Sequence, residues 1–205
     1  MKIIAISDTH GLHNHLKIPD GDMIIHAGDF CNTGAINDFN HFIKWYKSLP
    51  HTHKVCIAGN HDHCMQKFKF LKDDFEEAGI VYLEDSSITI EGIKFYGSPW
   101  TPEFLHWAFM YRRGHGYTHW DNVPKDTDIL ITHGPSYGIL DMPINDGHIG
   151  CEELLNKVKQ LSLTYHIFGH IHESYGIDGY HINASSWDHI NNKMNKPIEL
   201  ICIKS

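Results

Sequence analysis

The chain has 205 residues, 41% hydrophobic and 20% charged, which is the composition of an ordinary globular protein able to bury a sizeable core. We expect one folded domain over residues 1–205. Its 25 acidic and 17 basic residues give a formal charge of −8, which argues against a long nucleic acid as partner, since such binding needs clustered positive charge. Its 19 histidines outnumber Lys and Arg together and raise the hypothesis of a metal site.

The sequence also indicates a compartment. The N-terminal apolar run before Ser7 is too short for a signal-peptide core, and no stretch approaches the length of a membrane span. The five cysteines contain no CxxC pair, so neither a zinc ribbon nor a thioredoxin-type centre is indicated. Reduced, buried thiols are the simplest interpretation. We expect a soluble cytoplasmic protein without a membrane partner; the oligomeric state stays open.

Six short runs rich in Ile, Val, Phe and Tyr predict β-strands. Their apolar residues are nearly continuous rather than alternating, which is typical of strands covered on both faces. The runs are residues 2–7, 22–28, 54–59, 128–132, 165–169 and 198–204.

Helical patterns lie between some of these runs. Residues 36–49 place large apolar side chains at helical spacing and stop before Pro50. Residues 151–161 have acids in the first turn and Lys later, which suits a helix dipole.

Hairpins and a long aromatic segment complete the pattern. Residues 88–98 predict a hairpin turning at Glu91-Gly92, and residues 175–185 one turning at Asp178-Gly179. Residues 98–120 are too apolar for a disordered loop, and we interpret them as a folded loop or short helix over a pocket. Together these elements predict an α/β fold with mixed sheets.

The first five strand-like runs share one feature, because each is followed by Gly-flanked residues with metal-ligand side chains. The carboxyl ends of strands are where ligand sites gather in α/β sheets. Each signal alone is more often a cap or a turn, but five in order favour a common site. The residues are Asp8-Thr9-His10-Gly11, Gly28-Asp29, Gly59-Asn60-His61-Asp62, Thr132-His133-Gly134 and Gly169-His170-Ile171-His172.

The candidate ligands suit a particular ion chemistry. Two carboxylates, one amide oxygen and several imidazoles, without a thiolate, are appropriate to Mn, Fe or Zn. There are too many ligands for one catalytic ion but enough for two ions that share a bridging carboxylate. Two ions about 3.5–4 Å apart can bind a phosphoryl group and stabilise its in-line displacement.

In this order, the motifs D-x-H, G-D, G-N-H-D, H and G-H-x-H resemble those of the calcineurin-like metallophosphoesterases. The phrases IIHAGDF, GSPWTPEF, DILITHGP, GCEELL, FGHIHESYG and INAS are closer still to the metallophosphoesterase-domain (MPPED) branch. The resemblance runs from the first strand to about residue 197. It departs at Asn195-Lys196-Pro197, where the branch has Asn-Pro-Pro, which puts nothing catalytic in doubt.

The resemblance implies a four-layer α/β/β/α sandwich with two mixed β-sheets and a pair of divalent ions, most often Mn²⁺, with Fe or Zn as alternatives. It assigns one ion to Asp8, His10, Asp29 and His172. It assigns the other to Asp29, Asn60, His133 and His170, with Asp29 as the bridge.

The same resemblance gives His61 and Asp62 catalytic roles. His61 would lie beside the leaving group, stabilising the transition state or protonating the departing oxygen. Asp62 would orient the His61 ring.

Three further residues are candidate substrate contacts. Arg112 and Arg113 could bind substrate phosphate, although an adjacent arginine pair on a loop is more often a solvated patch. Trp100 could form a base-stacking wall with Trp107 and Tyr111, although packing within the loop is the simpler explanation.

Several functions stay open at this point. The first hypothesis is a hydrolase that cleaves phosphodiesters by in-line attack of a metal-bridging hydroxide, and the branch resemblance points to cyclic nucleotides or other small phosphodiesters. One alternative is a phosphomonoesterase acting on a small phosphorylated substrate. Another is a weakly active nucleotide-binding or scaffold protein, but a decayed site should lack His61 or one of His170 and His172. A purely structural metal site would leave His61 and Asp62 without a purpose.

Overall fold

The computed structural model describes residues 1–203. The first of its two large sheets contains β1 (Lys2–Ile6), β2 (Met23–Ala27), β3 (His53–Ile57), β4 (Val81–Tyr82) and β15 (Ile198–Ile201). The strand order is β15-β1-β2-β3-β4. β1 to β4 run parallel, and β15 pairs antiparallel with β1 at the edge.

The second large sheet contains β5 (Ser86–Ile90), β6 (Ile93–Ser98), β9 (Ile129–Thr132), β10 (Tyr165–Phe168), β11 (Gly176–Asp178) and β12 (His181–Asn183). Its order is β11-β12-β10-β9-β6-β5. The four inner strands are parallel, and each edge strand is antiparallel to its neighbour. Both sheets are therefore mixed, with a parallel centre.

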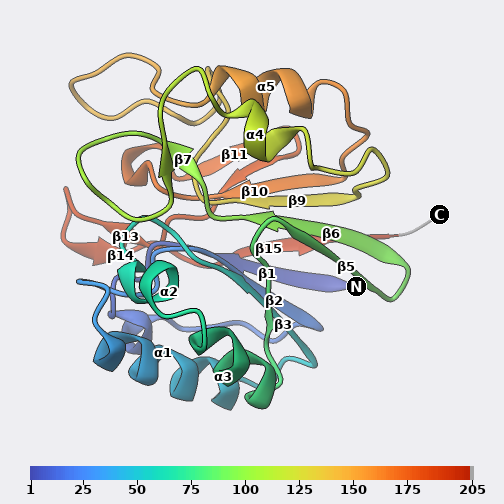
Figure 1. Ribbon diagram of the computed structural model, residues 1–205. Helices are drawn as coiled ribbons and strands as arrows, with labels where there is room; N and C mark the ends of the chain where they lie inside the picture. The colour runs from blue at the N-terminus through green and yellow to red at the C-terminus, as the bar shows by residue number, and fades with distance from the viewer. Residues whose placement is uncertain (204–205) are drawn as a thin grey trace.

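The two sheets pack face to face, with helices on their outer sides (Figure 1). The core between them joins Ile25 and Val55 of the first sheet to Phe95, Ile131 and Ile167 of the second. The helices are α1 (Ile36–Ser48), α2 (His63–Lys67), α3 (Leu71–Glu77), α4 (Tyr117–Trp120) and α5 (Glu152–Val158). In Figure 1, α1 and α3 lie below the sheets, and α4 and α5 lie above them.

Each outer face has its own apolar core. Phe39, Phe42 and Tyr46 share one face of α1 and pack with α3 against the first sheet. Leu154 and Val158 of α5 pack with α4 against the second sheet. Nearly every apolar side chain of β1, β2, β9 and β10 is buried, because the strands are covered on both sides.

The mixed α/β class predicted from the sequence is confirmed, and so are the helix that begins at Ile36 and the hairpin at Glu91-Gly92. The expectation of two covered faces is wrong for the last strand. Glu199 and Ile201 of β15 are exposed and alternate with buried residues, as in an edge strand with one solvated face. Lys204, the end of that run, lies outside the described residues.

The aromatic segment 98–120 folds as predicted into short elements beside a cleft. It contains β7 (Thr101–Pro102), β8 (Met110–Tyr111) and α4, and β7 pairs with β8. A second small pair joins β13 (Trp187–Asp188) to β14 (Lys193–Met194). Short 3-10 turns occupy His13–His15 and His172–Ser174. Within residues 1–203, no helix has the length and apolar character needed to cross a bilayer.

Candidate metal centre

The five polar motifs meet at one end of the molecule. Asp8, Asp29 and Asn60 follow β1, β2 and β3 of the first sheet, and His133 and His170 follow β9 and β10 of the second. Because these strands run parallel within each sheet, their carboxyl ends share an edge. The two edges are joined by an isolated bridge between Ser7 and Ser185.

Four candidate ligands have left-handed backbone conformations. Asp8, His10, Asp29 and His170 have φ values of 51°, 44°, 57° and 70°. Such conformations are uncommon for residues with a side chain and cost on the order of 1–3 kcal/mol each. Backbone hydrogen bonds hold the first two turns, including His10 N to Asp29 O at 3.0 Å. Strain concentrated at these positions is typical of a functional site.

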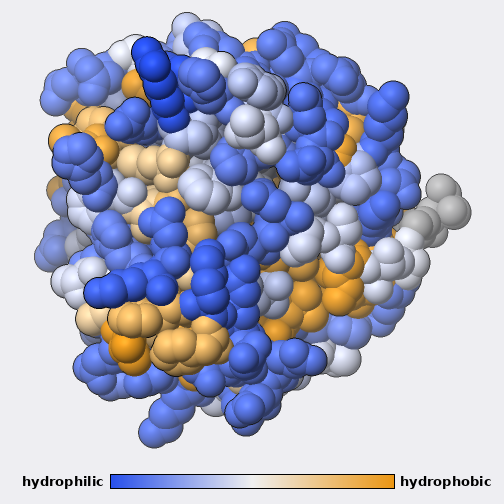
Figure 2. All heavy atoms as spheres, in the orientation of Figure 1, coloured by the Kyte–Doolittle hydropathy of each residue, from blue (hydrophilic) through white to orange (hydrophobic). Residues whose placement is uncertain are grey.

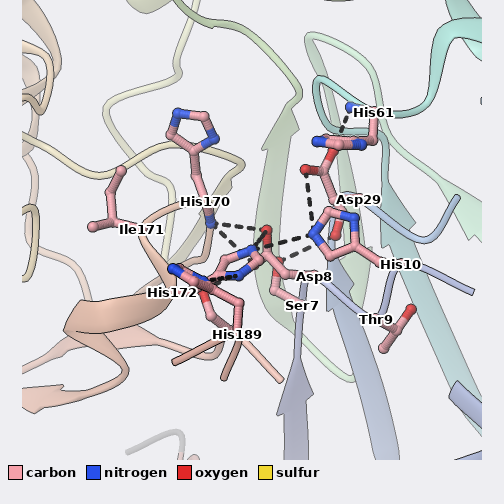
Figure 3. Close-up of polar contacts among 12 residues, drawn as sticks. Ser7, Asp8, Thr9, His10, Asp29, His61, His170, Ile171, His172 and His189 are labelled. Atoms are coloured by element: carbon pink, nitrogen blue, oxygen red, sulfur yellow. Dashed lines mark hydrogen bonds and ion pairs between the residues drawn. The ribbon is translucent and has the colours of Figure 1, made fainter. Parts of the chain in front are cut away.

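The first predicted ligand set is assembled. His172 Nε2 lies 3.4 Å from Asp8 Oδ1 and 3.2 Å from His10 Nε2, and His10 Nε2 lies 4.0 Å from Asp29 Oδ2. Two atoms that bind one ion at about 2.1 Å are themselves about 3–4 Å apart. Asp8, His10 and His172 converge in Figure 3, and their donor atoms fit a divalent cation.

The second predicted ligand set is assembled in part. His133 Nε2 lies 3.3 Å from Asp29 Oδ2 and 2.8 Å from Asn60 Oδ1. The donor atoms of Asp8, Asp29 and His133 lie within 4.8 Å of one another. The His170 ring is beside His133, with ring centroids 5.1 Å apart, but it points away from Asp8 in Figure 3. His170 belongs to none of the clusters of His, Cys, Asp and Glu donor atoms within 4.8 Å of one another among residues 1–203.

The electrostatics of the cluster suit cation binding. Burial alone raises the pKa of Asp8 and Asp29, but the neighbouring histidines outweigh it and hold both carboxyls well below their ordinary pKa. Burial lowers the pKa of His10 and His170 to about 4, so both imidazoles are neutral near pH 7. Burial acts against a charged His133, but Asp29 raises its pKa to about 9, so His133 must release a proton when it ligates a cation. Ionised carboxylates and neutral imidazoles are the forms that ligate metals.

Two glycines make this close approach possible. A Cβ atom on Gly59 would collide with Asp29 Oδ1 and with the His133 ring, and one on Gly169 would collide with Asp8 Oδ2. Both positions precede a candidate ligand in the sequence. Glycine is therefore required there for space.

The role expected for Asp62 is wrong. Its buried carboxylate accepts hydrogen bonds from the backbone N–H groups of Asp29, Gly59 and Cys31, at 2.9, 2.8 and 2.8 Å. The His61 ring is oriented instead by a 2.8 Å contact between its Nδ1 and the carbonyl oxygen of Asn32. Burial and the Asp29 carboxylate raise the pKa of Asp62 to about 8, against the opposing effect of its N–H donors. Asp62 thus ties the loop after β2 to the loop after β3.

His61 lies at the mouth of the cluster, as a residue that touches substrate should. One of its ring nitrogens is within 4.8 Å of the donor atoms of His10 and Asp29. Its ring stacks on Trp107, with centroids 4.2 Å apart. Both side chains line a cleft of about 920 Å³ that opens on the metal ligands. His61 is therefore placed between the candidate ions and the space available to a substrate.

The sequence motifs did not identify the residues that hydrogen-bond to the candidate ligands and hold them in place. Ser185 Oγ donates a 2.9 Å hydrogen bond to Asp8 Oδ2. His189 Nδ1 lies 3.4 Å from His172 Nδ1, and His189 Nε2 lies 3.3 Å from Glu173 Oε1 (Figure 3). Contacts of this kind fix the orientation of a metal ligand. The INAS phrase contains Ser185, whereas no motif signals His189 or Asn32.

The three candidate substrate contacts have different positions. Arg113 lines the cleft, but its guanidinium donates to the carbonyl oxygens of Gly150 and Ile149. Arg112 is exposed and lies outside the cleft lining. Trp100 stacks on His119 and donates to Asp85, so it packs within its own segment and does not line the cleft.

The chain is similar in sequence to a known protein family and to several individual proteins. Residues 1–174 match the family model of the calcineurin-like phosphoesterases. The human and mouse proteins called metallophosphoesterase domain-containing protein 1 are each 38% identical over 213 residues, covering 90% of this chain. UPF0046 protein K07C11.7 of Caenorhabditis elegans is 34% identical over 218 residues, covering 97% of this chain and 74% of its own length. The chain spans 65% of the length of the two mammalian relatives.

Proposed function

Because the chain belongs to the calcineurin-like phosphoesterase family, a family of metal-dependent hydrolases, we propose that it hydrolyses the phosphodiester bond of a small phosphorylated substrate. One observation carries the proposal: carboxylate, amide and imidazole donors from five strand ends converge beside a substrate-sized cleft. This donor set, rich in oxygen and imidazole and free of thiolate, fits Mn²⁺, Fe or Zn. We propose Mn²⁺ as the resident ion.

The ligands divide as their positions suggest. Asp8, His10 and His172 would hold one ion, and Asn60, His133 and His170 the other, with Asp29 between them. When bound, such a pair of ions draws a phosphoryl group into the site and lowers the pKa of water. Asp8 is kept in place by Ser185 and by the backbone N–H of His170, which lies 3.0 Å from Asp8 Oδ2.

His61 would act on the leaving group. Its Nδ1–H donates to the Asn32 carbonyl oxygen, so the proton and tautomer at Nδ1 are fixed. Nε2 carries a proton only in the imidazolium form, and from that form Nε2–H would donate its proton to the departing ester oxygen, leaving the neutral Nδ1–H imidazole. Trp107, stacked on the ring, restricts its rotation and excludes water from one of its faces.

Hydrolysis of bis-p-nitrophenyl phosphate, measured beside the monoester p-nitrophenyl phosphate, tests the proposal. The protein is stripped with a chelator and reloaded with Mn²⁺, and wild type is compared with His61→Ala, Asp29→Ala and the exposed-site control His15→Ala. We expect metal-dependent diester hydrolysis that falls by roughly 10²–10⁴-fold in His61→Ala. His15→Ala should match the wild type.

Each other outcome has a definite meaning. Preference for the monoester would keep the metal chemistry and replace the substrate class. Two bound ions without hydrolysis of either ester would overturn the enzymatic proposal in favour of a nucleotide-binding or scaffold role. We also propose a cytoplasmic location, which is supported by the buried thiols of Cys31, Cys56, Cys64 and Cys151, since reduced thiols are characteristic of a reducing compartment.

A further inference from the structure

The cleft beside the metal ligands has walls that are mostly apolar away from the ions. The apolar residues Leu12, Pro102, Phe104, Trp107, Ile149 and Ile171 line it. Its volume of about 920 Å³ is at the upper end of the range for ligand sites. A phosphoryl group occupies only the inner end, so the remaining space is available to another part of the substrate.

Large hydrophobic side chains stand exposed on the loops that border this cleft. Phe104 and Leu105 are each 64% exposed, Ile144 is 60% exposed and Met142 50% exposed. Figure 2 shows hydrophobic side chains on the side of the molecule where the loops beside β7 lie, as well as at the lower left and the right centre of the view. Exposed apolar surface next to a cleft is typical of a surface that is covered when a ligand binds.

The charges of the cleft do not favour a second anionic group. Among residues 1–203, Arg113 is the one Lys or Arg that lines it. Its Nη1 donates to Gly150 O at 2.9 Å and its Nη2 to Ile149 O at 2.7 Å, so two of its five N–H donors are engaged by backbone. Glu103, Asp146 and Glu173 line the same cleft and repel anions. Beyond the metal ligands, a second phosphate or a carboxylate would meet three carboxylates against the single positive charge of Arg113, so repulsion outweighs attraction.

We propose that this site selects phosphodiesters that carry one phosphate and an extended, uncharged alkyl or aryl ester group lying along the apolar wall. This inference rests on the proposed phosphodiesterase function and specifies its substrate class. The phosphate is recognised at the metal ligands, and the remaining ester group supplies binding energy by leaving water. Nucleoside polyphosphates and other multiply charged esters are disfavoured by the same arrangement.

A homologous series of p-nitrophenyl alkyl phosphates tests the inference, with alkyl groups from methyl to octyl and Mn²⁺-loaded protein. We expect kcat/KM to rise by about two- to fourfold for each added methylene until the chain outgrows the wall. An ester of equal length with a terminal carboxylate should be at least roughly tenfold poorer than the octyl ester, because it brings an anion toward Glu103 and Asp146.

Two variants test the role of the apolar wall without changing the metal ligands. Phe104→Ser and Ile149→Ser should flatten the dependence on chain length while leaving the methyl ester within about twofold of wild type, since both residues line the cleft and neither belongs to the metal ligands. Phe70→Ser is the matched control, because Phe70 is 60% exposed and lies outside the cleft lining. It should keep the full slope.

Calorimetric binding of alkyl(methyl)phosphinates, in which both ester oxygens are replaced by carbon so that no ester bond is present, gives a readout independent of turnover. Affinity should rise with chain length, with a heat capacity change that becomes more negative. The inference would be overturned by hydrolysis of every ester with no dependence on chain length. It would also be overturned if the dependence on chain length were unchanged in both wall variants. Either result would leave the phosphodiesterase proposal standing. Chain-length-dependent binding without hydrolysis of any ester would overturn the proposed function and leave the apolar wall standing.

Discussion

The carboxylate of Asp8 is the most tightly held of the candidate ligands. Ser185 Oγ lies 2.9 Å from its Oδ2, and the backbone N–H of His170 contacts both of its oxygens. The side chain of Asp8 is fully buried, and its backbone is left-handed at φ 51°. Its orientation is therefore fixed by the protein before a cation binds.

Removing the hydroxyl of Ser185 should weaken metal binding without unfolding the protein. Ser185→Ala leaves Asp8 Oδ2 without its side-chain donor, and loss of such a partner typically lowers metal affinity by about 10–100-fold. Isothermal calorimetry with Mn²⁺ on chelator-treated protein measures the change. Ser87→Ala, at an exposed position of β5, is the control. Equal affinities for wild type and Ser185→Ala would show that Asp8 does not depend on this bond.

The contacts of His189 with His172 and Glu173 allow a second test of metal binding. His189 contacts His172 Nδ1 and also the Glu173 carboxylate. His189→Ala should lower Mn²⁺ affinity by about tenfold, and His189→Gln should recover part of it, because an amide can still bond to the imidazole. The comparison is made by calorimetry. Identical affinity for both variants and wild type would remove His189 from the metal centre.

At the scale of elements, the site depends on loops that follow strands and on the groups that join them. Asp62 links the loops after β2 and β3 through three backbone donors. Helix α1 supports the same region from outside. Phe42 stacks on Phe30, which follows Asp29, with ring centroids 4.4 Å apart. The Tyr46 hydroxyl contacts the carbonyl oxygens of Ile24 and Val55.

Replacing Asp62 should destabilise the protein strongly. Asp62→Ala leaves three N–H groups without an acceptor, and each buried unsatisfied donor costs about 1–3 kcal/mol. We expect a loss of at least about 3 kcal/mol in the free energy of unfolding, measured by urea denaturation. The exposed Asp73→Ala should change it by no more than about 0.5 kcal/mol. A similar small loss for Asp62→Ala would contradict the assigned role.

The secondary-structure elements were easier to predict from the sequence than the contacts between residues that lie far apart in it. Strands β1, β2, β9 and β10 were predictable because unbroken apolar runs leave few alternatives. The metal ligands followed because parallel strands place their carboxyl ends together. The bond from Ser185 to Asp8 spans 177 residues, and the contact between the His61 ring and the Asn32 carbonyl involves a backbone atom that any residue would supply. Local sequence carries no signal for contacts of either kind.

The misassigned role of Asp62 has the same origin. A carboxylate next to His61 in sequence suggests a partner for that ring, but the chain turns between the two residues. Asp62 then faces inward, fully buried, while the His61 ring faces the cleft. Likewise, Trp100 belongs to the predicted aromatic segment, and its orientation is decided by Asp85 and His119 rather than by local pattern.

At the scale of the whole molecule, metal binding should stabilise the fold. The ligands come from both sheets, so ions that bind them favour the native state, by about 2.7 kcal/mol per site at a hundredfold excess over Kd. We expect Mn²⁺ to raise the unfolding temperature of chelator-treated protein by roughly 5–10 °C in scanning calorimetry. Asp29→Ala should show little of this shift. A wild-type temperature that does not respond to Mn²⁺ would contradict the assignment of the centre.

The bridge between Ser7 and Ser185 also bears on how the protein is made. Asp8 is synthesised 177 residues before Ser185, which supplies the hydroxyl that orients it. β15, the strand beside β1, follows later still. We therefore expect the nascent chain to acquire its ions late, after synthesis has passed residue 185. Metal loading would then follow the synthesis of the whole segment from Asp8 to Ser185.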